Sequence, residues 1–320
     1  MEILLRFGIL GDAKIAREKL VPALRRAGCD IVHLGRRDEL ASVSDDIWQG
    51  VKTGSYEDVL ADPKVEAVYI PLPNHLHVPW SVRAMEAGKA VLCEKPMALS
   101  SEEISELERA SAQNGCYIYE AFMVRHHPQW DWLIKLDIGA NYHLSSQFSY
   151  PPQPEGNIRN IAAWGGGPVW DIGCYCVLAG LRIFGKTPKL LSATVRAEQH
   201  LDVEQSATAL LEFGNGRTAS ISVSSGASLS QLVRVVGTDG WAQLDVPFNP
   251  PEVTTARWAH VSAGKDSLLG PGQTVTFEPC DHYQLMVEAF VKAVREGKAS
   301  DFSDSRTLTE ILTEIITYRN

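Results

Sequence analysis

The first 120 residues alternate apolar segments of strand length with segments of helical periodicity, and this alternation constrains the fold more than any other feature. Residues 3–10 form an apolar run, residues 12–27 carry apolar side chains at helical spacing, and residues 29–34 form a second apolar run. Strands that alternate with helices predict a parallel, doubly wound sheet. Only a short polar stretch, residues 38–50, follows the second strand, so one crossover helix is expected to be abbreviated. The alternation continues with strands expected at 65–70, 89–93 and 116–120 and helices at about 76–87 and 100–113.

The pattern changes after about residue 121, where apolar and polar side chains alternate over short segments. Such alternation predicts an antiparallel sheet with one buried face. Asn215 and Gly216 lie between two of these segments and predict a tight hairpin turn. Helices are expected at about 168–184, 281–296 and 305–318. The expected strands are 143–150, 189–199, 205–213, 217–225, 231–236, 241–246, 252–258 and 273–278.

The composition excludes several classes of protein. A hydrophobic content of 45% with 22% charged residues is ordinary for a globular protein and argues against a disordered chain. The net charge of −9 argues against binding to nucleic acid or to an anionic membrane surface. The sequence shows no run of ~20 apolar residues and no signal-peptide pattern, so we expect a cytoplasmic protein with no membrane partner. The six cysteines show no zinc-like spacing, and no metal site is expected.

The turn after the first strand carries a variant of the glycine-rich dinucleotide fingerprint. Gly11 supplies the glycine of the tight turn, and Ala16 the small residue that packs helix on strand, whereas Ala13 stands where a second glycine is usual. A strand–helix turn without a ligand is the alternative, but its place in a β–α–β unit favours a dinucleotide. The residues expected to contact the cofactor here are Gly8, Gly11, Ala13, Lys14 and Ile15.

The end of the second strand favours NADP, with NAD possible. A carboxylate at this strand tip would bind the ribose hydroxyls of NAD, but Gly35 occupies the place and Arg36 and Arg37 follow. Guanidinium groups pair well with a 2′-phosphate. The alternative is a solvated arginine pair neutralised by Asp38 and Glu39.

These features predict two domains in the 320 residues, at roughly 150 residues per domain. The first is an α/β Rossmann domain with a doubly wound parallel sheet, over residues 1–121. The second is an α+β domain with a large, mainly antiparallel open sheet, over residues 122–320, that binds substrate and mediates oligomerisation.

Two further motifs resemble those of one enzyme family. Glu94-Lys95-Pro96 follows the strand at 89–93, at the edge of the sheet where ligands bind in such folds. The segment from Trp164 through three glycines to Asp171 and Tyr175 places the last two residues four apart, on one helical face. Both motifs are similar to those of the Gfo/Idh/MocA family of nicotinamide-dependent oxidoreductases, and the resemblance spans nearly the whole chain.

The resemblance implies the remaining site residues. Many members of the family carry histidine where this chain has Tyr175; the tyrosine resembles the branch that contains glucose–fructose oxidoreductase, dimeric dihydrodiol dehydrogenase and NADP-dependent xylose dehydrogenases. Lys95, Asp171 and Tyr175 are the expected catalytic residues. The further cofactor contacts implied are Pro71, Asn74, His77, Glu94, Lys95 and Trp164. The substrate contacts expected are Phe122, Arg125, Trp164, Asp171, Tyr175 and His282.

The expected reaction is hydride transfer between a nicotinamide and a carbinol of a sugar, polyol or cyclic diol. Tyr175 would act as acid or base, Lys95 would stabilise its phenolate, and Asp171 would orient the lysine or a substrate hydroxyl. The alternatives are a cofactor-recycling sugar oxidoreductase or hydrolase with tightly bound nicotinamide, and a non-catalytic NAD(P)-sensing regulator. A homodimer or homotetramer formed through the second domain's sheet is also expected.

Overall fold

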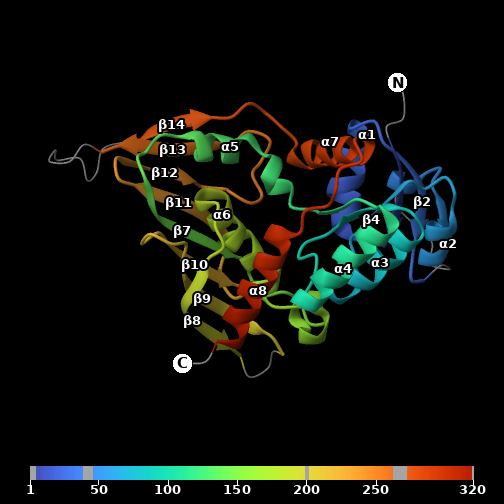
Figure 1. Cartoon of the computed structure of the whole chain (residues 1–320), viewed down its shortest axis with the longest axis horizontal. Coiled ribbons are helices and arrows are strands. Elements are labelled where there is room, and N and C mark those ends of the chain that lie inside the picture. Colours follow the sequence, from blue (N-terminus) through green and yellow to red (C-terminus); the bar gives the residue numbers. More distant parts are fainter. Residues whose placement is uncertain (1–4, 39–45, 199–201, 262–271, 319–320) are drawn as a thin grey trace. The chain divides into compact units, whose positions relative to one another are not determined.

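The computed structural model of the chain (Figure 1) describes four stretches of sequence, 5–38, 46–198, 202–261 and 272–318. They form two compact units. The first unit comprises residues 1–126 together with 281–305, and the second comprises 127–280 together with 306–320. Residues 281–305 thus belong to the first unit, whereas the sequence prediction placed everything after residue 121 in the second domain. Nothing in the local pattern of that helix indicates which sheet it covers.

The first unit is built on a six-stranded parallel sheet, in the order β3-β2-β1-β4-β5-β6. This confirms the predicted doubly wound sheet. The strand order reverses between β1 and β4, which is the point where ligands bind in such sheets, beyond the carboxyl ends of the strands. The strands are β1 (Arg6–Leu10), β2 (Asp30–Gly35), β3 (Lys52–Gly54), β4 (Ala67–Ile70), β5 (Ala90–Cys93) and β6 (Ile118–Glu120).

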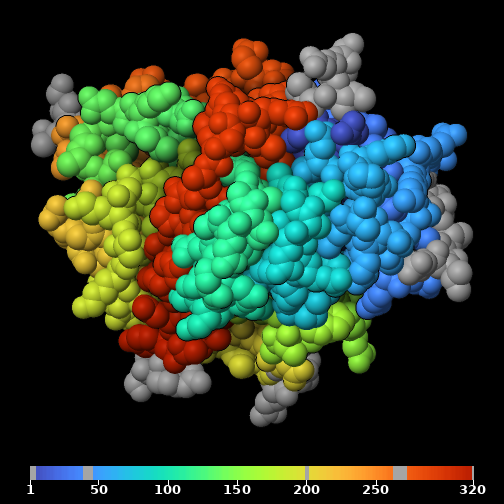
Figure 2. Space-filling view, turned by 45° about the vertical axis from the view of Figure 1, so that its right-hand side comes forward, coloured from blue at the N-terminus to red at the C-terminus, as the bar shows by residue number. Residues whose placement is uncertain are grey.

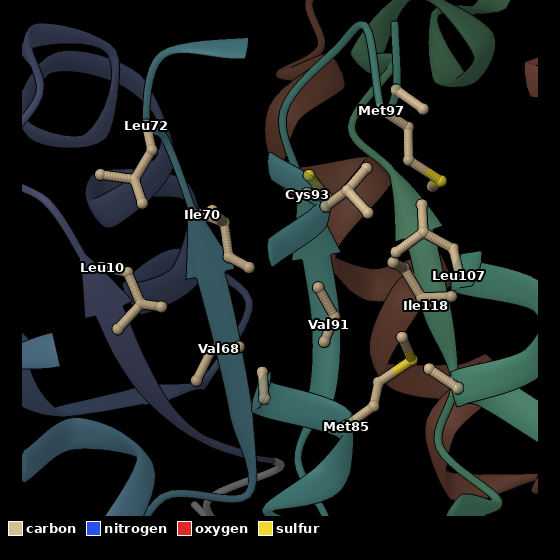
Figure 3. Close-up of a cluster of buried hydrophobic side chains, with 14 of the residues drawn as sticks. Leu10, Val68, Ile70, Leu72, Met85, Val91, Cys93, Met97, Leu107 and Ile118 are labelled. Atoms are coloured by element: carbon tan, nitrogen blue, oxygen red, sulfur yellow. The ribbon is translucent and has the colours of Figure 1, made fainter. Parts of the chain in front are cut away.

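Helices cover both faces of this sheet (Figure 1). α3 and α4 pack against each other, and the buried apolar side chains between them and the sheet form the core shown in Figure 3. α7 packs against α1, and its orange-red surface borders the blue N-terminal helix in Figure 2. The helices of this unit are α1 (Val21–Arg26), α2 (Tyr56–Ala61), α3 (His77–Glu86), α4 (Ser101–Asn114) and α7 (His282–Arg295).

The helix expected at 12–27 is present but irregular. It contains a π-helical turn, Ala16–Leu20, directly before α1. Pro22 has no amide hydrogen to donate to the carbonyl of residue 18, so the regular hydrogen-bond ladder cannot continue through this position. The π turn accommodates the proline without ending the helix.

The prediction missed β3 and α2. β3 is a three-residue edge strand without a buried side chain, so it has no apolar pattern. α2 does carry a signal, because Ser55 and Asp58 form a capping box: the Ser55 hydroxyl accepts the Asp58 amide at 3.1 Å, and the Asp58 carboxylate accepts the Ser55 amide at 2.9 Å. The crossover between the second and third predicted strands is therefore a short strand and a capped helix.

The second unit is built on an eight-stranded sheet, in the order β14-β13-β12-β11-β7-β10-β9-β8. Only β7 and β10 run parallel; the other neighbouring pairs are antiparallel, which confirms the predicted mainly antiparallel sheet. Asn215, at φ 58°, forms the predicted turn between β9 and β10. The strands are β7 (Asn141–Ser149), β8 (Lys189–Ala197), β9 (Glu204–Glu212), β10 (Thr218–Ser224), β11 (Ser230–Gly237), β12 (Gly240–Leu244), β13 (Thr255–His260) and β14 (Gln273–Thr276).

α6 (Cys174–Phe184) lies across one face of this sheet, in contact with β7 and β10. α6 packs so closely on the sheet that a Cβ at Gly180 would lie 2.5 Å from the Phe213 ring. The segment Ala162–Phe184 is the one described stretch that is long and apolar enough for a membrane span, and 78% of its most apolar window is buried inside the protein, as in a core helix. The other helices with residues in this unit are α5 (Pro128–Lys135), which the prediction missed, and α8 (Ser303–Thr317), which begins in the first unit.

Candidate active site

The turn between β1 and the first helix has the backbone of a dinucleotide-binding turn. Gly11 has φ +117°, which favours glycine, and its amide donates to the Gly35 carbonyl at 2.9 Å. The turn is thereby fixed to the tip of β2. Gly8 lies inside β1, where a Cβ would come within 2.3 Å of Val59, so its absent side chain makes room for α2.

The first helix begins directly after this glycine turn, so its N-terminal end lies at the turn. Ala16 is fully buried, as the fingerprint requires of the small residue that packs helix on strand. Lys14 is exposed and lies 3.8 Å from Glu18. The Asp12 carboxylate accepts from Arg17 at 2.8 Å and from the indole of Trp48 at 3.0 Å. Arg17 therefore balances the acidic residue of the turn, so the residues present suit a phosphate group at the helix N-terminus.

The tip of β2 leaves no space for a side chain at residue 35. A Cβ at Gly35 would lie 2.9 Å from the Tyr56 ring and 3.0 Å from the Ser55 carbonyl oxygen. The Arg36 amide donates to the Gly54 carbonyl at 2.9 Å, so Arg36 and Arg37 follow directly beyond the sheet edge. Burial raises the pKa of Tyr56, and the nearby charge of Arg37 opposes that shift. Of the acidic residues considered as partners for the arginines, Glu39 lies outside the described residues.

The segment that carries Lys95 is held at the carboxyl ends of β4, β5 and β6 by three buried polar groups. Tyr69 donates to the Glu94 carboxylate at 2.6 Å. The Met97 amide donates to the Glu120 carboxylate at 2.8 Å. His77 lies 2.7 Å from the Pro96 carbonyl oxygen through Nδ1. The backbone on both sides of Lys95 is therefore fixed by residues from three other elements.

His77 is fully buried, and its expected contact with the cofactor stays a prediction. Its second ring nitrogen, Nε2, lies 2.8 Å from the Leu72 carbonyl oxygen, so the ring connects the backbone after β4 to the backbone after β5. Burial lowers the pKa of His77 to about 4. His77 thus fixes the backbone beyond both strands at this edge of the sheet. Pro71 and the 3-10 turn with Asn74 lie in the same connection.

Glu120 is a site residue that the sequence analysis did not single out. Its carboxyl is buried and also accepts from the Ser305 hydroxyl, and burial raises its pKa although these hydrogen bonds oppose the shift. Nearby, Arg125 donates to Asp304 at 2.7 Å and lies over the Phe122 ring. Phe122 is fully buried and His282, at the start of α7, is 7% exposed. Only the position of Glu120 at a predicted strand tip could have indicated its role.

The triple glycine in the second unit accommodates the protein's own polar groups. A Cβ at Gly166 would lie 2.7 Å from the Arg159 carbonyl oxygen, and a Cβ at Gly167, which has φ +98°, would lie 2.4 Å from the Glu204 carboxylate. Glu204 in turn accepts the Val169 amide at 2.9 Å. The glycines therefore allow the loop and the carboxylate to approach the start of the helix.

Asp171 lies in a π-helical turn, Val169–Gly173, that leads into α6. Its carboxylate accepts from Arg159 Nε at 2.6 Å and its side chain is 14% exposed. Asp171 contributes to the raised pKa of the neighbouring Tyr150, for which burial is the main cause. π turns are frequent at functional sites.

Tyr175 follows one turn later and is almost fully buried. Its ring packs against Phe148 and Phe248, with ring centroids 5.9 and 5.5 Å apart. The phenol is thus held rigidly by apolar neighbours. Trp164 ends the 3-10 turn Ala162–Trp164, just before the glycines.

The structure therefore groups the predicted residues into two sets. The first unit holds the glycine turn, the arginines, the Lys95 segment, Phe122, Arg125 and His282, and the second holds Trp164, Asp171 and Tyr175. Because Lys95 and Tyr175 belong to different units, their pairing stays a prediction. Among the described residues, no group of three or more His, Cys, Asp or Glu side chains could hold a metal ion.

Two family models match the chain. The model of an oxidoreductase family with an NAD-binding Rossmann fold matches residues 5–122, and the GFO/IDH/MocA C-terminal domain model matches residues 132–243.

Individual proteins match over most of their length. An uncharacterised oxidoreductase of Rhizobium meliloti is 38% identical over 92% of this chain and 90% of its own length. The D-xylose 1-dehydrogenase (NADP(+)) 2 of Haloferax volcanii is 35% identical over 91% of this chain and 90% of its own. Among solved structures, a 3-ketoreductase from Actinomadura kijaniata in complex with NADP and TDP-benzene superimposes with a TM-score of 0.87 at 27% identity, covering 97% of this chain and 96% of that one.

Proposed function

This chain belongs to the Gfo/Idh/MocA family of NAD-binding oxidoreductases, and from that premise we propose that it transfers a hydride between NADP and a carbinol carbon of an aldose, polyol or cyclic diol. It is a dehydrogenase or reductase of CH–OH groups, as the named relatives are. The observation that carries the substrate class is the match over nine-tenths of its length to a D-xylose 1-dehydrogenase.

The residues at the tips of β1 and β2 fit a dinucleotide phosphate and favour NADP. Gly11, Ala13, Lys14 and Ile15 would hold the pyrophosphate at the helix N-terminus. Gly35 leaves no carboxylate at the ribose position, and Arg36 and Arg37 would bind the 2′-phosphate. The named xylose dehydrogenase uses NADP, and the 3-ketoreductase was solved with it, which supports the proposal.

This cofactor preference has a direct test. Replacing both Arg36 and Arg37 by alanine should weaken NADP binding by one to two orders of magnitude and leave NAD binding nearly unchanged, because only NADP carries the 2′-phosphate. Dissociation constants from quenching of tryptophan fluorescence measure this without any substrate. An equal loss for both cofactors would contradict the assignment.

The chain's own part in the reaction is to move one proton. The bound nicotinamide supplies the hydride acceptor or donor. In the oxidative direction, the Tyr175 phenolate takes the proton of the substrate hydroxyl as the hydride leaves the carbon. A phenol has a pKa of about 10, so a nearby cation is needed for it to act near neutrality. We assign this electrostatic role to Lys95, whose backbone is fixed on both sides, and the orientation of the reacting groups to Asp171.

The reaction is tested by screening pentoses, hexoses, inositols and trans-diols with NADP and NAD, with reduction followed at 340 nm. Tyr175→Phe should lower kcat by about 10²–10⁴-fold while the NADP dissociation constant is unchanged. Unaltered turnover in this variant would refute the role of the tyrosine. Nicotinamide that co-purifies with the protein would favour the cofactor-recycling alternative, and cofactor binding without turnover of any substrate would favour the sensor.

We also propose that two copies associate through the sheet face opposite α6. On this face Leu232 and Val236 of β11 and Trp241 of β12 are partly exposed, and Val236 is 39% exposed. Beside them on the same face lie the polar side chains of β7, namely His143, Ser145 and Gln147. The test is light scattering after size exclusion. Val236→Lys should convert a dimer to a monomer if this face is the interface.

A further inference from the structure

Asp171, to which the reaction assigns an orienting role, is already paired within its own unit. Arg159 Nε donates to its carboxylate at 2.6 Å, and the Arg159 side chain is 42% exposed while the Asp171 side chain is 14% exposed. The ion pair is therefore partly desolvated but still open on the arginine side. Such a pair is stronger than one at a fully exposed surface.

The backbone of Arg159 is held in place by the triple glycine. The Gly167 amide donates to the Arg159 carbonyl at 2.8 Å, and Gly166 has no Cβ that would block this carbonyl. On the other side, the Asn157 side chain accepts the Arg159 amide at 3.0 Å. Two hydrogen bonds thus fix the backbone of the arginine whose side chain pairs with Asp171.

The charged and titratable groups around this arginine are few. Asp171 is the main cause of the raised pKa of Arg159, and the phenols of Tyr150 and Tyr175 add to the same shift. Glu204 lies further along the same cluster, bound to the Val169 amide, and burial raises its pKa. The elements that pack on the Tyr175 ring contribute the apolar Phe148 and Phe248. Arg159 therefore supplies a positive charge to this cluster from within the second unit.

We propose that Arg159 is a positioning residue for the reaction: it holds Asp171 as a carboxylate and supplies a fixed positive charge beside the Tyr175 phenol. This rests on the proposed function. In the oxidative direction the phenol first loses its proton to solvent, and the resulting phenolate accepts the proton of the substrate hydroxyl. A guanidinium beside the phenolate favours the first of these steps at lower pH. The second unit thus carries an activating charge of its own for the tyrosine.

Removal of the positive charge of Arg159 should shift the pH dependence of kcat. Arg159→Gln and Arg159→Met both remove the guanidinium on a side chain of similar length. Either should move the acidic limb of kcat for oxidation to higher pH by about one unit, since loss of a nearby opposite charge shifts a pKa by about one to three units. Arg159→Lys keeps a cation and should restore most of the shift. A purely structural arginine would lower activity at every pH and leave the limb in place.

The control is Arg182→Gln. It removes an arginine from α6, the helix that carries Tyr175, and this arginine pairs with Asp131 at 3.6 Å. Its pH limb should coincide with that of the unmodified enzyme. A second measurement does not require turnover: the tyrosinate absorbance of the holoenzyme minus that of Tyr175→Phe reports the phenol directly, and its midpoint should rise by about one unit in Arg159→Gln.

The outcomes separate the inference from the proposed function. If no substrate is turned over but the tyrosinate midpoint shifts, the proposed reaction fails and the electrostatic role of Arg159 stands. If turnover is found but neither the limb nor the midpoint moves in Arg159→Gln or Arg159→Met, the inference is overturned and the proposed reaction stands. Failure of Arg159→Lys to restore either quantity also overturns it.

Discussion

Gly167→Ala tests whether the triple glycine is there to accommodate Glu204. Gly167 has φ +98°, and a Cβ would lie 2.4 Å from one Glu204 carboxylate oxygen and 2.5 Å from the other. The alanine therefore has two costs. A side chain at positive φ costs about 1–2 kcal/mol. Displacing the carboxylate breaks its hydrogen bond with the Val169 amide, which costs about 1–3 kcal/mol when the donor stays buried.

The expected loss in the free energy of unfolding is the sum, about 2–5 kcal/mol. Gly156→Ala is the matched control, because Gly156 has φ +80° with no atom within 4 Å of the Cβ position. It should cost only the backbone contribution of about 1–2 kcal/mol. The same substitution made in a Glu204→Ala background should also cost only that amount, which leaves a coupling energy of about 1–3 kcal/mol between the two sites.

The assay is urea unfolding followed by circular dichroism for the single and double variants. Catalysis gives a second readout, because the Asp171 amide donates to the Gly167 carbonyl at 3.0 Å and a shift there moves the helix start. Equal losses for Gly167→Ala and Gly156→Ala, or an equal cost with and without Glu204, would refute the reasoning.

Three other predictions concern stability. His127 caps α5 by accepting a hydrogen bond from the Gln129 amide at 3.2 Å, and burial lowers its pKa to about 4. In the unfolded chain the pKa of a histidine is about 6.5. The free energy of unfolding should therefore fall by about 3 kcal/mol as the pH drops from 6.5 to 4. His127→Asn keeps a cap without titrating, so its unfolding free energy should depend less on pH, and parallel curves would contradict this. Ser55→Ala should cost about 1 kcal/mol in urea unfolding by removing the α2 cap, whereas Ser55→Asn, which keeps a capping oxygen, should cost little. Gly180→Ala should cost about 1–3 kcal/mol through contact with Phe213, and Phe213→Leu should relieve it in a double variant.

Most elements of the fold could be predicted because each has a strong local pattern. The eight strands of the second sheet all appear within a few residues of their predicted ranges, since one buried face imposes strict alternation. Lys52–Gly54 could not be found because an exposed edge strand has no such pattern. α5 was missed although His127 and Pro128 form a start signal, because a helix of eight residues is too short to show a clear helical period.

The site was predictable in its motifs but not in its supporting contacts. Lys95, Asp171 and Tyr175 stand in recognisable segments. The roles of Glu120, which binds the Met97 amide, and of Arg159, which binds Asp171, depend on partners 23 and 12 residues away. His77 shows the same limit: the sequence indicated a polar residue near the cofactor, but only the fold shows its ring between two backbone carbonyls.

The single parallel pair in the second sheet has a consequence for how this unit folds. β7 is the first strand of its sheet to be synthesised, yet its two neighbours in the sheet are β10 and β11. His143 of β7 pairs with Thr218 of β10, which lies 75 residues later in the chain. β8, β9 and β10 instead pair in order along the chain. Non-local pairing has a large loop-closure cost and slows folding. We therefore expect β8–β10 to form first and β7 to join them late, so a ribosome-bound chain that ends before residue 218 leaves its first strand without a neighbour.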